Sequence, residues 1–231
     1  MLAHAITSFL IFTAFLLLLL VSISVPVIKT IYLFRLAAQA STSLLDASAS
    51  AFVRFGVWGY CISSVNVSVI GIDGNLSPAQ CSKAKLGYDF DGVVQAALRA
   101  ENINSNTISH ELTAVLVLHP IGSCGFTFLA LLASLFIIRR HAVGVSRGAA
   151  LLTLGLGLLS ALLTTVIFLI DVILVAIVKT RIKNDTDGDV TGTWGNAVWM
   201  ILGAAVALWG ALIGTIVTLL RGGRKARASR Y

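Results

Sequence analysis

Two of the three cysteines, Cys61 and Cys81, are the residues whose type and spacing point most directly to chemistry. Nineteen residues separate them, in a stretch that contains no apolar run of membrane length. A disulfide that closes a loop of this size stabilises a fold by roughly 3 kcal/mol in the chain-entropy model. The alternative is a redox-active pair, but no neighbouring residue would activate a thiolate, so a structural disulfide is favoured. Cys124 lies inside an apolar run and is interpreted as a packed free thiol.

Two ionisable residues lie within apolar runs, where charge is costly and usually partnered. They are His119 and Asp171, and each lies eight residues from a charged residue at the end of its run, Glu111 and Lys179 respectively. At about 1.5 Å per residue, both would lie some 12 Å deep on the same side of a membrane. The matched depth predicts contact between His119 and Asp171. Two interpretations stay open: a polar clasp between helices, which is favoured, and a proton-responsive switch, because histidine titrates near neutral pH.

No set of residues with catalytic spacing is found. The four histidines are scattered, and the sequence contains no HExxH, no GxSxG, no phosphate-binding glycine loop and no cysteine cluster of metal spacing. The sequence therefore predicts no enzyme, no metal site and no cofactor. A small channel or transporter remains a third class, although one intramembrane acid and no internal repeat argue against it.

The elements that position these residues are membrane helices. Hydrophobic residues make up 57% of the chain and charged residues 12%, against about 25% charged residues in a soluble domain. Four apolar runs reach the roughly 20 residues that a membrane span requires. The runs are 5–28, 112–138, 149–178 and 197–220. The predicted fold is a four-transmembrane-helix bundle, in a single membrane domain over residues 1–231.

The distribution of Lys and Arg predicts the orientation. The 139–148 connection carries three arginines and the tail 221–231 carries five basic residues, without an acid in either, whereas acids balance bases in 29–111 and 179–195. Both termini are therefore expected in the cytoplasm of a multi-pass plasma-membrane protein. The net charge of +7 arises on that side and requires no nucleic-acid partner. The basic tail would bind anionic lipid or act only as stop-transfer charge.

Three Asn-x-Ser/Thr acceptors fall in the two predicted outer loops, as expected for glycosylation. They are Asn66, Asn75 and Asn184, of which Asn66 is favoured.

The first outer loop is expected to hold a small extracellular antiparallel sheet. Alternating Val, Ile and aromatic residues predict strands over 52–61 and 64–70, and 71–75 has turn residues. Residues 41–50 are small and polar and predict a loop. Asp91 would cap a short helix, followed by a linker over 102–107.

The fourth apolar run carries small residues at intervals of four, three and four, which places them on one helix face. They are Gly203, Ala207, Gly210 and Gly214. This spacing favours close packing within one bundle, and the alternative is a face for homo-oligomer formation.

The segment Gly56-Val-Trp58-Gly59-Tyr-Cys61 with its distant Cys81, together with Leu118-His119-Pro120-Ile121, resembles a known family. It is similar to the fungal PalI (pH-response regulator) family and the related cortical-patch tetraspans, within the claudin-like superfamily. The resemblance covers essentially the whole chain. It implies a membrane bundle with a disulfide-stapled sheet in the first loop.

The resemblance also implies a function and partners. We expect a non-enzymatic protein that assists an ambient-pH-sensing complex, with a partner such as a seven-span pH sensor in the lipid bilayer. The alternative is a structural organiser of cortical membrane domains, of the eisosome type, or a protein that contacts the cell wall.

Overall fold

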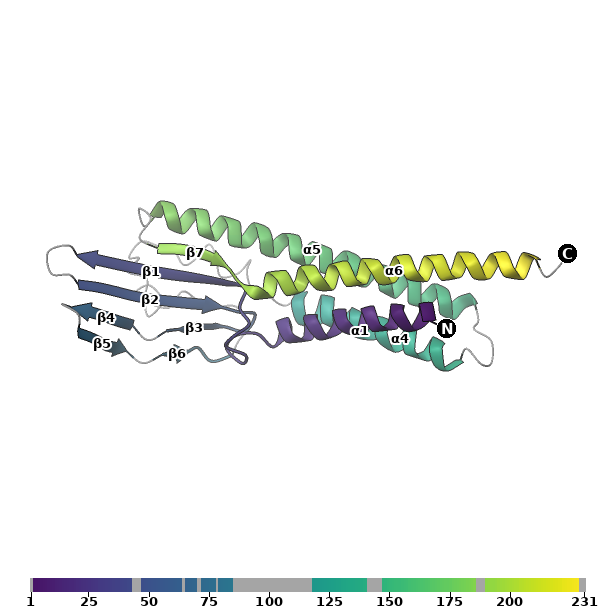
Figure 1. Cartoon of the computed structure of the whole chain (residues 1–231), viewed down its shortest axis with the longest axis horizontal. Coiled ribbons are helices and arrows are strands. Elements are labelled where there is room, and N and C mark those ends of the chain that lie inside the picture. Colours follow the sequence, from purple (N-terminus) through teal and green to yellow (C-terminus); the bar gives the residue numbers. More distant parts are fainter. Residues whose placement is uncertain are drawn as a thin grey trace. The chain divides into compact units, whose positions relative to one another are not determined.

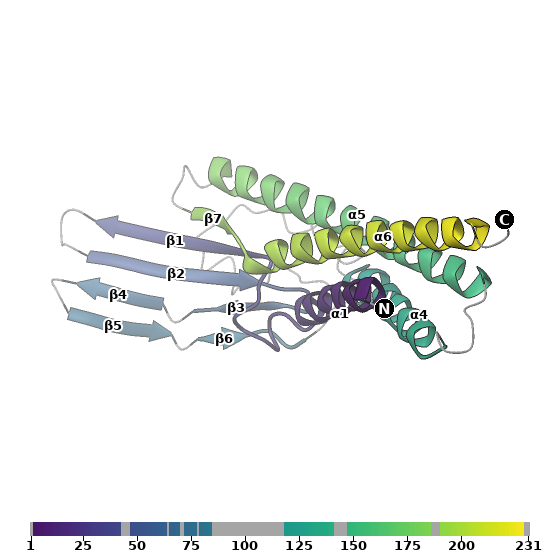
Figure 2. The same cartoon turned by 45° about the vertical axis from the view of Figure 1, so that its right-hand side comes forward.

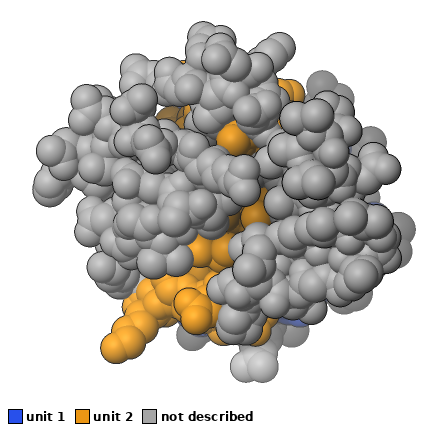
Figure 3. All heavy atoms as spheres, turned by 90° about the vertical axis from the view of Figure 1, so that its left-hand side faces the viewer, with its two compact units in different colours: residues 1–19, 118–168, 200–231 blue, residues 20–117, 169–199 orange. Residues whose placement is uncertain are grey.

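The computed structural model divides the chain into two compact units, which are described separately (Figure 3). Unit 1 comprises residues 1–19, 118–168 and 200–231, and unit 2 comprises residues 20–117 and 169–199. The residues described are 2–42, 47–63, 65–69, 72–77, 79–84, 118–140, 147–185 and 190–228. The helix expected after Asp91 and the linker over 102–107 lie outside them.

Among the described residues, four helical segments are long and apolar enough to cross a membrane, which confirms the predicted four-span fold. The helices are α1 (Leu2–Ser22), η2 (His119–Gly125) continued by α4 (Phe126–Arg140), α5 (Arg147–Asp185) and α6 (Asn196–Ala228). The predicted span limits differ at some ends. The first helix ends at Ser22 rather than at residue 28, because the chain turns there, with the Ile23 N–H bonded to the Leu20 carbonyl.

In unit 1, the helices run alongside one another (Figure 1), and small residues lie where they pack together. Ala14, Ala161 and Ala204 are fully buried in one cluster with Leu18 and Leu208. A second cluster joins α1, α4 and α6 through residues that are all apolar, namely Ile11, Ala130, Leu131 and Ala211. Membrane helices associate through such close packing, since lipid is as apolar as their side chains.

The second span begins with a wide π-helical turn, η2. Pro120 lies in the first turn of η2, where a helix makes no backbone hydrogen bond through the N–H that proline lacks. Ser123 Oγ donates to the His119 carbonyl at 2.7 Å, and Thr127 Oγ1 donates to the Ser123 carbonyl at 2.6 Å. These hydroxyls satisfy carbonyl groups that a regular helix would bond through its backbone.

Unit 2 contains an antiparallel sheet (Figure 2). Its main path runs β5-β4-β2-β1-β7, with β3 on β2 and β6 on β3. The strands are β1 (Phe34–Thr42), β2 (Ala47–Phe55), β3 (Tyr60–Ile62), β4 (Val65–Val69), β5 (Ile72–Ser77), β6 (Gln80–Cys81) and β7 (Val190–Trp194). β7 therefore brings the end of the second loop into the sheet of the first.

The two faces of the sheet differ in burial, as alternating side chains require. One face buries Phe34, Leu36, Val53 and Phe55 almost completely. The rings of Phe34 and Phe55, which are cross-strand partners, stack with centroids 4.5 Å apart. The opposite face carries half-buried polar and aromatic side chains.

Several local predictions for the loops were wrong. Residues 41–42 end β1 and residues 47–50 begin β2, so the predicted loop over 41–50 is mostly strand, and residues 72–75 belong to β5 rather than to a turn. A neighbouring strand supplies the hydrogen bonds that make small polar residues extended, and sequence propensity does not show that neighbour. The predicted strand over 52–61 is interrupted between Phe55 and Tyr60.

Candidate functional site

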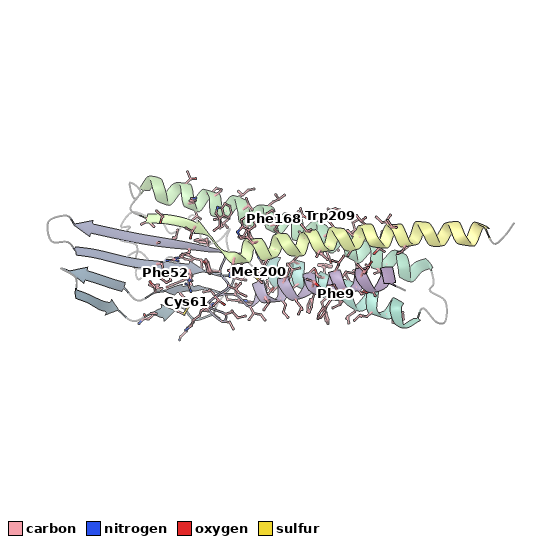
Figure 4. All side chains as sticks on the ribbon, in the orientation of Figure 1. Phe9, Phe52, Cys61, Phe168, Met200 and Trp209 are labelled. Carbon is pink, nitrogen blue, oxygen red and sulfur yellow. A yellow bond between two sulfur atoms is a disulfide. The ribbon has the colours of Figure 1, made fainter. Side chains whose placement is uncertain are left out.

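The candidate site is the segment 56–61 with its disulfide, in unit 2. Cys61 in β3 and Cys81 in β6 are direct cross-strand partners and form a disulfide, which confirms the predicted pairing. Their Cα atoms are 4.0 Å apart. Figure 4 shows Cys61 on the same part of the sheet as Phe52. The disulfide therefore fixes the short β3–β6 pair, which has few backbone hydrogen bonds of its own.

Trp58 attaches the segment to the end of the first helix. Its indole Nε1–H donates to the Ser22 carbonyl, and its backbone N–H donates to the Val25 carbonyl at 3.3 Å. The neighbouring Val57 N–H donates to Ser24 Oγ at 2.9 Å. The Ser22 carbonyl lies in the last turn of α1, where a helix leaves carbonyls without partners. Trp58 therefore has a structural contact that ties the sheet to the last turn of α1.

The two glycines of the motif are required by close approach. A Cβ added to Gly56 would lie 2.5 Å from the Val25 carbonyl oxygen and 2.7 Å from its Cβ. A Cβ on Gly59 would meet Ser82 Oγ, which accepts a hydrogen bond from the Tyr60 N–H at 3.1 Å. A side chain at Gly56 would have to displace the Val25 backbone, and one at Gly59 would have to displace the Ser82 hydroxyl that accepts the Tyr60 hydrogen bond.

A second connection, between the start of α6 and the chain leading into β1, was missed by the sequence analysis. Asn196 Oδ1 accepts the Tyr32 N–H at 3.0 Å, and Asn196 Nδ2 donates to the Thr30 carbonyl at 2.8 Å. Gly195 lies so close to the Tyr32 and Leu33 carbonyls that a side chain there would collide with backbone. A sequence signal was available, because Asn196 comes directly before an apolar run and Asn is common at the start of a helix.

A cluster of arginine and aromatic side chains on the half-buried face of the sheet was also missed. Arg35 and Arg54 are cross-strand partners, and the guanidinium carbons of both lie over the Phe52 ring, at 4.0 and 4.9 Å from its centroid. The guanidinium of Arg54 also lies 5.4 Å from the Tyr32 ring centroid. The sequence signal was the alternation along β2, in which Val53 and Phe55 lie on the buried face of the sheet and Phe52 and Arg54 on the opposite face.

His119 and Asp171 are both buried, with 1% and 3% of their surfaces exposed. His119 is the first residue of η2 in unit 1, and Asp171 lies in the part of α5 that belongs to unit 2. Their predicted contact stays a prediction.

In unit 1, the small residues of α6 lie against α1. A Cβ on Gly203 would lie 3.5 Å from Leu17, one on Gly210 3.7 Å from Leu10, and one on Gly214 3.0 Å from the Thr7 hydroxyl. Ala207 packs against the cluster that contains Ala14 and Leu18. This face of α6 is therefore used for contacts within the chain.

The three glycosylation acceptors lie in different elements. Asn66 and Asn75 are register partners in β4 and β5, whereas Asn184 lies inside α5, which continues beyond the predicted span. The predicted glycosylation sites stay predictions. No group of three metal-ligating side chains is found among the described residues.

Four apolar spans and an antiparallel sheet closed by one disulfide define a claudin-like tetraspan membrane protein. Within that class, the model of the SUR7/PalI family matches residues 3–213 of this chain. The match covers most of the 231 residues, and the chain belongs to the SUR7/PalI family. No curated protein matches the sequence significantly.

Proposed function

We propose that this protein is a non-enzymatic component of the plasma membrane that assists an ambient-pH-sensing complex. The observation that carries the proposal is the family match over residues 3–213, together with the likeness of the 56–61 motif to PalI proteins. The partner would be a membrane protein such as a seven-span pH sensor. With both termini in the cytoplasm, the sheet would face the medium whose pH is sensed.

The anchoring of the sheet supports a role in presenting a surface to a partner. The Trp58 bond to Ser22 and the Asn196 bonds to Tyr32 and Thr30 tie the sheet to the ends of two spans. The disulfide removes freedom from the β3–β6 pair. A preorganised surface loses less conformational entropy when it binds.

A second candidate is an organiser of cortical membrane domains. It is supported by membership of the SUR7/PalI family, since the sequence also resembles the cortical-patch tetraspans. Large apolar side chains that are exposed along the spans also support it, among them Phe9, Leu162 and Ile213. Such side chains would contact lipid or neighbouring membrane proteins, as lateral association of this protein within the membrane requires.

Proximity labelling at the cell surface, compared between the wild type and Trp58→Ala, tests the proposal. We expect a seven-span sensor among the labelled neighbours of the wild type and its loss from those of the variant. Trp199→Ala is the control, because Trp199 is 65% exposed. Two observations would instead support the organiser. The protein would form static patches at the cell cortex, and cells that lack the protein would grow normally at alkaline pH. Ion flux in liposomes would favour a channel and contradict both.

A further inference from the structure

The polar face of the sheet contains two like charges in direct register. Arg35 of β1 and Arg54 of β2 are cross-strand partners, with Thr193 of β7 beyond Arg35 and Cys61 of β3 beyond Arg54. Like charges at directly opposed positions destabilise a sheet. Among the described residues, no carboxylate forms a salt bridge with either arginine. Within the described part of the chain, the double positive charge at this position is therefore not compensated by an acid.

Both guanidinium groups are held in place rather than left free in solvent. They share the ring of Phe52, and Arg54 Nη1 donates to the Lys29 carbonyl at 3.3 Å. Cation–π contacts of this kind fix a guanidinium and leave its edge open to an acceptor. The Nε of each arginine is buried, and neither has a hydrogen-bond acceptor among the described residues. Among the described residues both charges therefore lack an anion, and a ligand from outside would be bound through the Nη groups because each Nε is enclosed by protein.

The position of this row relative to the membrane spans identifies the kind of anion. Thr193, the register partner of Arg35, precedes the first residue of the fourth span, Asn196, by three residues. Three residues of extended chain cover about 10 Å. The headgroup layer extends about 5–8 Å beyond the hydrocarbon on each side. The backbone of the row therefore lies at most a few ångström beyond this layer, and the arginine side chains would reach the phosphates of the adjoining leaflet.

Aromatic residues around the row support this placement. Tyr32 lies beneath Arg54, and the exposed Trp194 and Trp199 lie on either side of the start of α6. Tyr and Trp concentrate at the level of the lipid headgroups. A guanidinium group binds phosphate oxygens through two parallel N–H donors.

We propose that Arg35 and Arg54, oriented by Phe52, bind the phosphate of a phospholipid headgroup in the leaflet next to the sheet. The phosphate oxygens accept from the guanidinium N–H groups and neutralise the opposed charges. This site is separate from the basic tail, because its residues belong to the sheet.

Lipid-dependent thermal stability of the purified full-length chain in a neutral detergent tests the proposal. All proteins carry Gln at the five basic tail positions 221, 224, 225, 227 and 230, so the tail does not contribute. Phosphatidylglycerol is titrated, with diacylglycerol of the same acyl chains and inorganic phosphate as separate probes. We expect phosphatidylglycerol to raise the melting temperature, and diacylglycerol to leave it unchanged.

The variants separate charge from fold. R35Q/R54Q is expected to weaken phosphatidylglycerol binding at least tenfold, whereas K83Q, which removes an exposed charge elsewhere in unit 2, retains it. F52L keeps both charges and is expected to lose about threefold. An intact Cys61–Cys81 disulfide and an unchanged elution volume establish that each variant is folded. If R35Q/R54Q does not fold, R35K/R54K and a salt titration of the parent protein replace it, since 1 M salt screens such contacts.

Three results would overturn the proposal. The first is that folded R35Q/R54Q is stabilised by phosphatidylglycerol as much as the parent protein. If that variant does not fold, the equivalent result is that 1 M salt does not reduce the stabilisation of the parent protein. Another is equal stabilisation by diacylglycerol. The third is saturation of the same effect by millimolar inorganic phosphate, which would make the site one for soluble anions.

Discussion

At the scale of single residues, the 56–61 motif is constrained mainly by how closely its backbone approaches the chain after α1. Gly56 lies against the Val25 backbone, and Trp58 bonds to the carbonyls of Ser22 and Val25. The residues on which the resemblance to PalI proteins rests thus connect the end of α1 to the sheet. Their side-chain types follow from packing and hydrogen bonding at that joint.

Gly56→Ala tests the close approach. The added Cβ would lie 2.5 Å from a main-chain oxygen, so backbone has to move. We expect a loss of about 2–3 kcal/mol in the free energy of unfolding, as in overpacked cores, measured by denaturation in mixed micelles. Gly155→Ala is the matched control, because nothing lies within 4 Å of its added Cβ. Equal stability of the two variants would contradict the close contact.

Trp58→Phe tests the indole hydrogen bond to the Ser22 carbonyl. Phenylalanine keeps most of the apolar ring and removes the donor, which leaves a carbonyl at the helix end without that partner. The expected loss is about 1–2 kcal/mol, seen as a lower midpoint in the same denaturation assay. Trp199→Phe, at a 65% exposed position, should change stability by less than about 0.5 kcal/mol. A midpoint for Trp58→Phe at the wild-type value would refute the role of the indole.

At the scale of elements, the small residues of α6 pack against α1 within one chain. Leu10 and Leu17 of α1 lie within 4 Å of where side chains on Gly210 and Gly203 would begin. Glycine at these positions lets the two helices approach closely, which is how helices associate in lipid.

Gly210→Leu therefore should destabilise the bundle and leave its oligomeric state unchanged. Overpacking is expected to reduce the free energy of unfolding by about 1–3 kcal/mol, while light scattering after size exclusion gives the same mass as the wild type. Val206→Leu, on the exposed side of the same helix, is the control. A shift of Gly210→Leu from dimer to monomer, with unchanged stability, would assign this face to oligomer formation.

Helices were easier to predict from this sequence than strands. The four apolar runs are long, so hydropathy alone locates them, with errors at ends such as Ser22. β7 was missed because a five-residue strand that contains Gly192 becomes extended only through pairing with β1. The Arg35–Arg54 row was missed for the same reason, since register joins residues that are far apart in sequence. The disulfide was found because cysteine chemistry is specific.

At the scale of the whole molecule, two ionisable groups are buried in helical segments that belong to different units. His119 belongs to unit 1 and Asp171 to unit 2, and the two residues are almost fully buried. Sequence depth predicts that they meet, but depth fixes only one coordinate of a side chain. The face of each helix that they occupy comes from packing, which hydropathy does not encode.

A double-mutant cycle tests the predicted contact. His119→Gln, Asp171→Asn and the double variant are compared by denaturation in mixed micelles at neutral pH. Contact predicts a coupling free energy of about 0.5–3 kcal/mol between the two substitutions. Additive effects would show that each group is accommodated separately.

The pairing of β1 with β7 also determines when, during synthesis, the sheet can be completed. β1 begins at Phe34, whereas its partner β7 ends at Trp194, only two residues before α6 begins. During synthesis, the β1 edge that pairs with β7 would therefore keep unpaired N–H and C=O groups until residues 190–194 have been made. An unfinished or truncated chain would thus be distinguishable from a finished one by an open strand edge. Quality-control factors that bind extended backbone could use that edge to retain incomplete molecules.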